Sequence, residues 1–239
     1  MIPNLEDLKV KIFADGADLG SMKLMYKEPH IKGLTTNPTL MRKAGIENYQ
    51  EFALEVLSQM TEKPISLEVF CDDLDEMIIQ GTKISSWGEN VFVKIPITNT
   101  LGISTVPVIE SLCNSGIKVN VTAVMTSEQV SAVSEVLNSE IPSYVSVFAG
   151  RIADTGRDPL PIIERSIFLL SGLDKAEVIW ASPRELLNIF QADQVGCHVI
   201  TATNDILNKI PLIGRDLEEY SLDTVKMFYK DALGSGYSI

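Results

Sequence analysis

Short apolar segments recur along the whole chain and predict the strands of a parallel sheet. Several of them are continuously apolar, as expected for strands that are covered on both faces. The eight predicted strands are Val10–Asp15, Lys32–Thr35, Ile65–Phe70, Val91–Ile95, Ile117–Thr122, Tyr144–Ala149, Glu177–Ala181 and Cys197–Thr201. Their starts lie about 20 to 33 residues apart, which is typical of repeated units of one strand and one helix.

Segments with helical periodicity lie between the predicted strands. In Asn48–Met60, apolar residues recur on one stripe, as in a helix that packs against a sheet. The other predicted helices are Leu74–Trp87, Ser104–Cys113, Ser127–Leu137, Pro159–Leu170 and Pro183–Ala192. Thr126 is a suitable N-cap, and Pro183 suits a first helical turn.

Eight strand–helix units predict an α/β fold with a single (β/α)8 TIM barrel domain over residues 1–239. A doubly wound open sheet is the alternative, but it usually has fewer strands and a glycine-rich first turn. Here the first turn reads Asp15-Gly16-Ala17-Asp18. A tail of about residues 215–239 adds a helix near Leu222–Asp231. Its apolar residues predict packing on its own barrel or on a neighbouring subunit, and we expect a homo-oligomer.

The composition narrows the possible partners. The 239 residues carry a net charge of −12, from 20 basic and 32 acidic side chains. This argues against binding to nucleic acid or to an anionic membrane, both of which need a basic surface. The chain has no segment as long as a membrane span and begins without a signal-peptide pattern. Cys71, Cys113 and Cys197 lack metal-site spacing, and we expect three buried thiols in a reducing cytoplasm and no metal.

Polar residues occupy the ends of most predicted strands, where a barrel places its active site. The most informative is Lys94, because burying a lysine in an apolar strand is costly unless the amine is paired or neutral. A neutral amine attacks carbonyl groups, so Lys94 is a candidate Schiff-base nucleophile. The other candidates at strand ends are Asp15, Thr35, Asn37, Glu68, Asn120, Thr122, Ser146, Arg151, Ser182 and Arg184.

Each candidate also has a structural alternative. Asp15 suits a helix N-cap, and Glu68 with Lys94 suits a buried ion pair. Asn120 and Thr122 suit hydrogen bonds to the barrel backbone, and the arginines suit surface ion pairs. Together, however, these residues place more polar groups inside one barrel than a structural core contains. Their number therefore favours a functional site.

Seven segments, in this order, resemble the transaldolase family, in particular the short group that includes fructose-6-phosphate aldolases. They are Ile12–Asp15, Gly33–Leu40 with its Thr-Thr-Asn-Pro element, Ser66–Val69, Val93–Pro96, Gly116–Thr122, Ser146–Arg151 and Ala181–Arg184. The resemblance extends over most of the chain. It implies a (β/α)8 barrel and aldol chemistry that needs no cofactor.

The resemblance also implies roles for four catalytic residues. Lys94 forms a Schiff base with a ketose phosphate. Asp15 accepts the proton from the hydroxyl at the bond that is cleaved. Glu68 and Thr122 hold the water that relays protons during imine formation.

The same resemblance implies how a sugar phosphate is bound. The residues implied to bind hydroxyls of the dihydroxyacetone portion are Thr35, Asn37, Asn120 and Ser146. Arg151, Ser182 and Arg184 are implied to hold the phosphate. Two arginines and a hydroxyl suit a dianion, and a helix starting at Pro183 would complete a phosphate site of the kind common in barrels.

Two related reactions fit these residues, transfer of the three-carbon unit to an aldehyde or its release as dihydroxyacetone. The family's aldolases tend to have Gln and Tyr at the positions of Glu68 and Phe148, and often Lys at that of Arg184. The chain thus resembles the transaldolases. Without a tyrosine hydroxyl at residue 148 to activate a water, protonation of the enamine is expected to be slow, which favours transfer of the sugar unit.

Two further points remain open in the sequence. The stretch Asp154–Pro159 is more charged than the family leads us to expect. Arg157 could add to phosphate binding or pair with Asp154, and we expect the pair. A barrel that binds sugar phosphates without turnover is the alternative from another functional class. The set of Lys94, Glu68 and Asp15 argues against it, because binding alone needs no buried amine.

Overall fold

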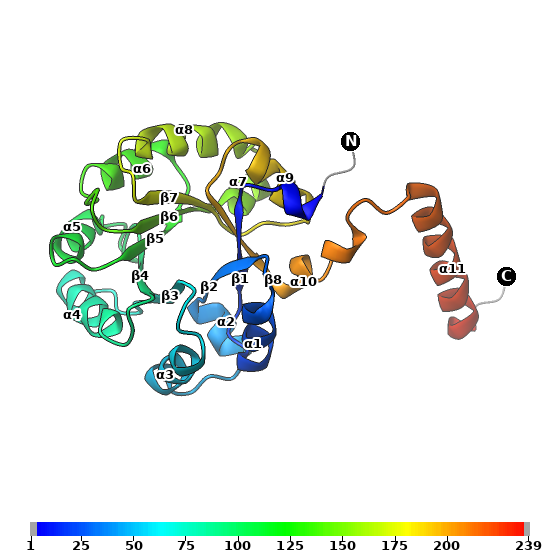
Figure 1. Ribbon diagram of the computed structural model, residues 1–239, viewed down its shortest axis with the longest axis horizontal. Helices are drawn as coiled ribbons and strands as arrows, with labels where there is room; N and C mark the ends of the chain where they lie inside the picture. The colour runs from blue at the N-terminus through cyan, green and yellow to red at the C-terminus, as the bar shows by residue number, and fades with distance from the viewer. Residues whose placement is uncertain (1–3, 237–239) are drawn as a thin grey trace.

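The computed structural model describes residues 4–236 and contains a closed barrel of eight parallel strands. Each strand pairs with the next along the chain, and β8 pairs with β1. The strands are β1 (Lys11–Asp15), β2 (Ile31–Thr35), β3 (Ile65–Glu68), β4 (Val91–Pro96), β5 (Val119–Val124), β6 (Ser143–Val147), β7 (Ala176–Trp180) and β8 (Val199–Thr203). The predicted (β/α)8 barrel is confirmed (Figure 1).

Helices follow the strands around the barrel, and the last of them lies apart from it (Figure 1). They are α1 (Leu19–Lys27), α2 (Pro38–Lys43), α3 (Tyr49–Gln59), α4 (Leu74–Ser85), α5 (Val106–Asn114), α6 (Ser127–Ser134), α7 (Ala149–Asp154), α8 (Leu160–Leu170), α9 (Leu187–Gln194), α10 (Asn204–Leu207) and α11 (Leu217–Ser235). Short 3-10 turns span Leu5–Asp7 and Ile210–Leu212. Thr126 caps α6 as predicted, in a capping box with Gln129.

The prediction that a helix begins at Pro183 is wrong. Pro183 lies in the loop after β7, and α9 begins only at Leu187. The physical reason is the preceding residue, Ser182, whose φ of 60° lies in the left-handed region. That conformation turns the chain before a helix can start.

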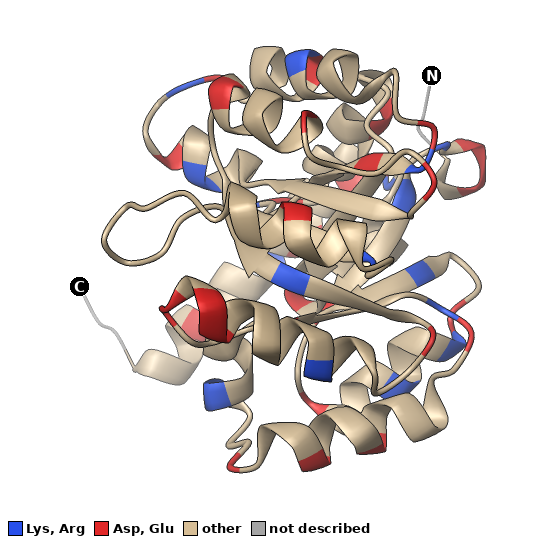
Figure 2. Cartoon of the chain, turned by 90° about the vertical axis from the view of Figure 1, so that its left-hand side faces the viewer, with Lys and Arg blue, Asp and Glu red and all other residues tan. Residues whose placement is uncertain are grey.

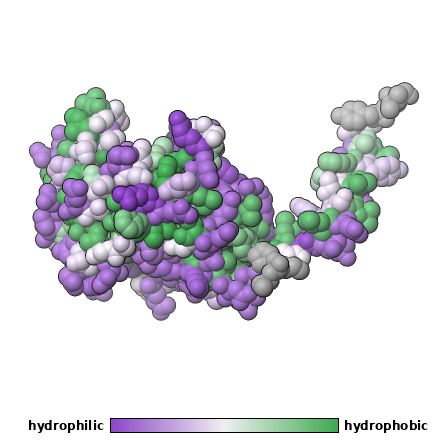
Figure 3. Space-filling model, turned by 90° about the horizontal axis from the view of Figure 1, so that it is seen from above, coloured by the Kyte–Doolittle hydropathy of each residue, from purple (hydrophilic) through white to green (hydrophobic). Residues whose placement is uncertain are grey.

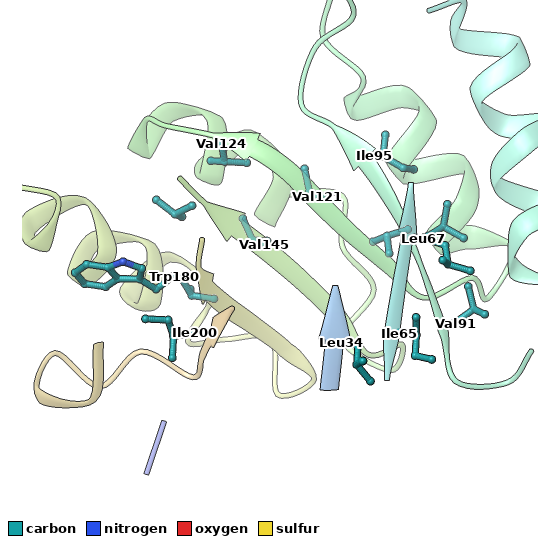
Figure 4. Close-up of a cluster of buried hydrophobic side chains, with 14 of the residues drawn as sticks. Leu34, Ile65, Leu67, Val91, Ile95, Val121, Val124, Val145, Trp180 and Ile200 are labelled. Atoms are coloured by element: carbon teal, nitrogen blue, oxygen red, sulfur yellow. The ribbon is translucent and has the colours of Figure 1, made fainter. Parts of the chain in front are cut away.

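Two apolar layers hold the barrel together. The outer layer fills the space between strands and helices and includes Leu34, Leu67, Val121 and Trp180 (Figure 4). The inner layer lies inside the barrel, where the Tyr144 ring contacts Phe13 and Phe92 at centroid distances of 5.6 and 4.4 Å.

The inner layer determines where the polar residues lie. Gly33 leaves room for it, because a Cβ there would come within 2.6 Å of the Phe13 ring. Side chains on one face of a strand recur every second residue. Asp15 and Lys94 therefore follow Phe13 and Phe92 on the inner face, directly above the aromatic rings. The two-residue alternation along the strands thus places a layer of polar side chains next to a layer of aromatic ones.

Helix α11 lies apart from the barrel, as the red ribbon in Figure 1 shows. It spans 19 residues, more than the predicted Leu222–Asp231, and none of these described residues is buried. Its exposed side chains include Leu217, Tyr220, Leu222, Val225, Met227, Phe228, Tyr229 and Leu233, and Figure 3 shows apolar atoms along this arm. Packing of the helix on its own barrel, one of the two expected arrangements, is therefore wrong.

The surface carries both signs of charge. On the face shown in Figure 2, basic residues are separated by acidic and uncharged ones. No helix within residues 4–236 combines the length and the apolar character that a bilayer span requires. Cys113 and Cys197 are buried as predicted, but Cys71 is partly exposed, because it lies in the loop after β3.

Candidate active site

A cavity of about 510 Å³ opens at the carboxyl ends of the strands. Every predicted site residue except Asn120 lines it, and the lining also includes Pro38, Thr39, Leu40, Ala123, Ala181, Pro183, Thr201 and Thr203. A barrel brings together the ends of all its strands. Residues far apart in sequence thus share one cavity.

The amine of Lys94 lies at the centre of this polar layer. Glu68 and Lys94 are neighbours across β3 and β4, and Lys94 Nζ lies 3.2 Å from Glu68 Oε2. The amine also donates a hydrogen bond of 2.9 Å to the carbonyl oxygen of Thr36. Only 8% of the Lys94 side chain is exposed. The ion pair considered as a structural alternative is therefore present, and it lies in the cavity.

Burial raises the pKa of Glu68 above its ordinary value, while the charge of Lys94 opposes this effect. The charge of Asp15 adds to the rise in this pKa. A carboxylate with a raised pKa is a stronger proton acceptor near neutral pH. Glu68 is thus suited to exchange a proton with the neighbouring amine or with a bound water.

Asp15 lies at the end of a chain of hydroxyls. Thr35 donates a 2.8 Å hydrogen bond to Asp15 Oδ1, and Asn37 donates one of 3.4 Å to Oδ2. The hydroxyls of Thr35 and Thr201 are 2.5 Å apart, and because Thr35 gives its only proton to Asp15, Thr201 is the donor. Burial raises the pKa of Asp15 against the opposing charge of Lys94 and these hydrogen bonds. The cap of α1 is Asp18, so Asp15 is not an N-cap.

Asn120 lies below the cavity rather than in its wall. Its side chain donates to Ser66 Oγ at 2.9 Å and accepts from Ser146 Oγ at 2.7 Å. Asn120 therefore orients Ser146, which does line the cavity. Two residues after Asn120, Thr122 Oγ1 is buried and has no hydrogen-bond partner among the described residues. A buried hydroxyl without a partner is uncommon in a folded protein.

The opposite wall carries the arginines. Arg184 binds Asp154 of α7 through two hydrogen bonds, one of them 3.0 Å from Nε to Oδ1. Arg151 is exposed, with its guanidinium 5.9 Å from the centroid of Phe148. The predicted pair between Arg157 and Asp154 is wrong, because Asp154 is held by Arg184 and Arg157 donates to Thr155.

Close packing fixes this wall. A Cβ at residue 150 would lie 1.6 Å from the carbonyl oxygen of Ser182. Only glycine therefore allows α7 to approach the loop after β7. The left-handed conformations of Ser182 and of Ala123, both in the cavity wall, are strained for residues other than glycine.

Four contributors were not predicted as site residues. Thr201 stands at a strand end and was detectable by that position. The carbonyl of Thr36, the carboxylate of Asp154 and the hydroxyl of Tyr49, which donates to the carbonyl oxygen of Glu68, have no such signal. Their roles depend on contacts between distant segments. Within residues 4–236, no group of three or more His, Cys, Asp or Glu side chains is arranged to hold a metal ion.

Comparisons with known proteins point to one family. Residues 12–237 match the family described as Transaldolase/Fructose-6-phosphate aldolase. Proteins named probable transaldolase from Nitrosopumilus maritimus (strain SCM1) and Thermoanaerobacter sp. (strain X514) are each 32% identical to this chain, over 223 and 218 residues. The two alignments cover 91% and 90% of this chain and 96% of each relative.

A solved structure supports the fold alone. The crystal structure of 2,3-dimethylmalate lyase, a member of the PEP mutase/isocitrate lyase superfamily, superposes with a TM-score of 0.55. The match covers 98% of this chain and 86% of that chain, at 12% sequence identity.

Proposed function

The chain belongs to the transaldolase/fructose-6-phosphate aldolase family, and from this premise we propose that it is a transaldolase. In this proposal it transfers a dihydroxyacetone unit from a ketose phosphate, such as fructose 6-phosphate or sedoheptulose 7-phosphate, to an aldose phosphate. The observation that carries the proposal is the buried Lys94 amine, 3.2 Å from Glu68 in a cavity that also contains Asp15. The donor ketone becomes a Schiff base on this amine.

Imine formation requires an acid–base group beside the amine. Glu68 takes up a proton as the amine attacks the ketone, and returns it as the carbinolamine loses water. Thr122 lines the same cavity. In this proposal its hydroxyl, which has no partner among the described residues, holds with Glu68 the water that relays these protons. Cleavage of the carbon–carbon bond then leaves a neutral enamine rather than a carbanion, because the lysine nitrogen accepts the electron pair.

Asp15 is the proposed base for cleavage. It takes the proton from the hydroxyl on the carbon that departs as an aldehyde, and returns this proton when the acceptor aldehyde reacts. Its raised pKa favours proton uptake, and the donors Thr35 and Asn37 fix its orientation.

The remaining residues bind the sugar phosphate. Thr35, Asn37 and Ser146 face the cavity as partners for the dihydroxyacetone hydroxyls, while Asn120 acts through Ser146. Arg151, Ser182 and Arg184 form the proposed phosphate site. A guanidinium binds a phosphate in a planar fork.

Transfer rather than release is favoured by Glu68 and Phe148, which match the transaldolase pattern. Phe148 lines the cavity without a hydroxyl, so it cannot activate a water to protonate the enamine. The enamine then persists until an aldehyde arrives. Release of dihydroxyacetone remains the second candidate reaction.

An assay with fructose 6-phosphate, with and without erythrose 4-phosphate, tests the proposal. A transaldolase forms product only when the acceptor is present, whereas an aldolase releases dihydroxyacetone without it. Borohydride reduction with fructose 6-phosphate adds a mass to Lys94 in both cases. A sugar-phosphate-binding protein without turnover gives no adduct and no product, and this result would overturn the proposal.

Arg184→Ala is expected to raise KM for phosphorylated donors, with a smaller effect on kcat, because the phosphate loses a bidentate partner. Asp154 competes with the phosphate for the same guanidinium. Asp154→Asn is therefore expected to lower this KM by a few-fold. Steady-state kinetics with fructose 6-phosphate and with unphosphorylated fructose measure both effects. An unchanged KM in the Arg184 variant would remove the phosphate assignment.

We further propose that the chain forms a homo-oligomer through α11. The apolar side chains of this helix are exposed and lie clear of its own barrel, and a patch of this kind usually marks an interaction site. Light scattering is expected to give an assembly larger than 26.3 kDa. Removal of residues 215–239 is expected to shift the protein toward the monomer, and an unchanged mass would exclude α11 as the contact.

The proposed setting is the cytoplasm, with sugar phosphates as the partners and no cofactor. The pentose phosphate pathway uses this reaction, and a specialised sugar pathway is the alternative. Assays with a panel of aldehyde acceptors would distinguish the two settings through acceptor preference.

A further inference from the structure

The backbone of Glu68 is held by a side chain from outside the barrel. The Tyr49 hydroxyl donates a hydrogen bond of 2.9 Å to the carbonyl oxygen of Glu68. Tyr49 is the first residue of α3, and Asn48 caps that helix. This contact links the outer ring of helices to the last residue of β3.

The hydrogen-bond ladder explains why a side chain is needed there. Along β2, Leu34 N–H donates to the carbonyl of Pro64 and Thr36 N–H donates to that of Ser66, at 2.9 and 3.2 Å. Parallel ladders continue with every second residue. The next donor would be residue 38 and the next acceptor would be Glu68. Residue 38 is proline, which has no N–H.

The Tyr49 hydroxyl thus takes the place of the missing backbone donor. Asn37 is still extended, with φ −156° and ψ 159°, so the chain keeps the direction of β2 up to the proline. Burial and the charge of Glu68 raise the pKa of the Tyr49 hydroxyl. The hydroxyl therefore keeps its proton and remains a donor across the range in which enzymes work.

Packing fixes the position of the Tyr49 ring. Its centroid lies 5.2 Å from that of Phe70 in an edge-on arrangement and 5.7 Å from that of Trp87. Phe70 follows β3 and Trp87 follows α4. Aromatic contacts at these distances favour a defined orientation, so the hydroxyl is held at the end of the strand that presents Glu68.

We propose that Tyr49 is a positioning residue for Glu68 in proton transfer to and from the Lys94 amine. This inference rests on the proposed Schiff-base function. The β4 strand also holds this end of β3, through the hydrogen bond from Val69 N–H to the Lys94 carbonyl. Without the Tyr49 bond, the Glu68 carbonyl loses its contact on the other side, and the carboxylate is held less closely to Lys94. Substrate binding is affected little, because Tyr49 does not line the catalytic cavity.

Tyr49→Phe tests the proposal, because it removes the hydroxyl and leaves the ring. We expect kcat for transfer to fall roughly tenfold with KM unchanged, equivalent to about 1.4 kcal/mol of transition-state stabilisation. We also expect the acid limb of the pH–rate profile to move to higher pH, because Lys94 then lowers the pKa of Glu68 less. Phe70→Leu is the matched control, since it disturbs the same aromatic cluster and keeps the hydroxyl.

The outcomes separate this proposal from the proposed function. A loss of kcat and a shifted acid limb in Tyr49→Phe, both absent in Phe70→Leu, support a positioning role. The positioning role would be overturned if Tyr49→Phe had the kinetics of the wild-type protein, or if the two variants changed equally. The proposed function would stand in either case, provided that the wild-type protein forms the borohydride adduct. Failure of wild-type protein to form that adduct would overturn the proposed function and this inference with it.

Discussion

Lys94→Ala is expected to abolish transfer and the borohydride adduct while the protein still folds. Loss of a nucleophile typically lowers kcat by roughly 10⁴- to 10⁶-fold, because no other group in the site can form the imine. Glu68 then lies in the cavity without its cationic partner. Its pKa is already raised by burial, so it takes up a proton instead of remaining an unpaired charge. Mass spectrometry of the reduced protein and circular dichroism measure the two results.

The chain offers a matched control in Lys11→Ala. Lys11 is also a strand lysine paired with a glutamate, since its Nζ lies 2.5 Å from Glu177 Oε2. That pair stands at the amino ends of the strands, at the opposite end of the barrel from the cavity. Lys11→Ala is expected to keep both the adduct and the activity. An adduct that persists in Lys94→Ala, or disappears in Lys11→Ala, would contradict the assignment of Lys94.

The barrel was predictable because its local signals agree with one another. Each apolar run reads as a buried parallel strand, and each interval holds a helix with one apolar stripe. The end of β7 shows where such signals fail. Pro183 fits the first turn of a helix by composition, but Ser182 has a left-handed backbone and its carbonyl oxygen closely approaches Gly150. That approach is a tertiary contact, which local sequence does not encode.

The candidate site was predictable to the extent that it follows the strands. Asp15, Glu68 and Lys94 stand at strand ends and meet because the barrel closes. Arg184 contacts Asp154 of α7, and Tyr49 of α3 contacts the end of β3. These partners come from distant segments, so only the fold determines them. The Asp154–Arg184 pair is the clearest case, since sequence distance favoured Arg157. The missing N–H of Pro38 was visible in the sequence, but its consequence required the register of β2 and β3.

The polar layer also has an energetic consequence. Glu68 and Asp15 both have raised pKa values, and the main cause in each case is burial. Folding therefore removes ionised carboxylates from water and is opposed by their desolvation. The proposed catalysis depends on the same property, because a raised pKa makes each carboxylate a stronger proton acceptor. Activity and stability are thus expected to respond in opposite directions when one of these carboxylates is removed.

Asp15→Asn is expected to show this opposition most clearly. Transfer activity falls by roughly 10²- to 10⁴-fold, as for loss of a general base, whereas stability at neutral pH rises by about 1 kcal/mol, or roughly 2–4 °C in Tm. In the unfolded chain Asp15 ionises near pH 3.8, but in the folded protein its pKa is higher. The wild-type protein therefore loses stability as pH rises through this interval, and the amide variant does not. The gain in Tm should be small below pH 3.8 and full above the folded pKa.

Asp18→Asn is the matched control for this pH dependence. Asp18 lies three residues further on, caps α1 and accepts a hydrogen bond from Ser21 N–H, which lowers its pKa. Ionised Asp18 stabilises the folded protein, whereas ionised Asp15 destabilises it. The stabilisation by Asp18 is present above pH 3.8 and is lost as the pH falls through its lowered folded-state pKa. Asp18→Asn should therefore keep full activity and show no gain in Tm at neutral pH. If Asp15→Asn lowers Tm at neutral pH, or raises it equally at all pH values, burial of this carboxylate is not what opposes folding.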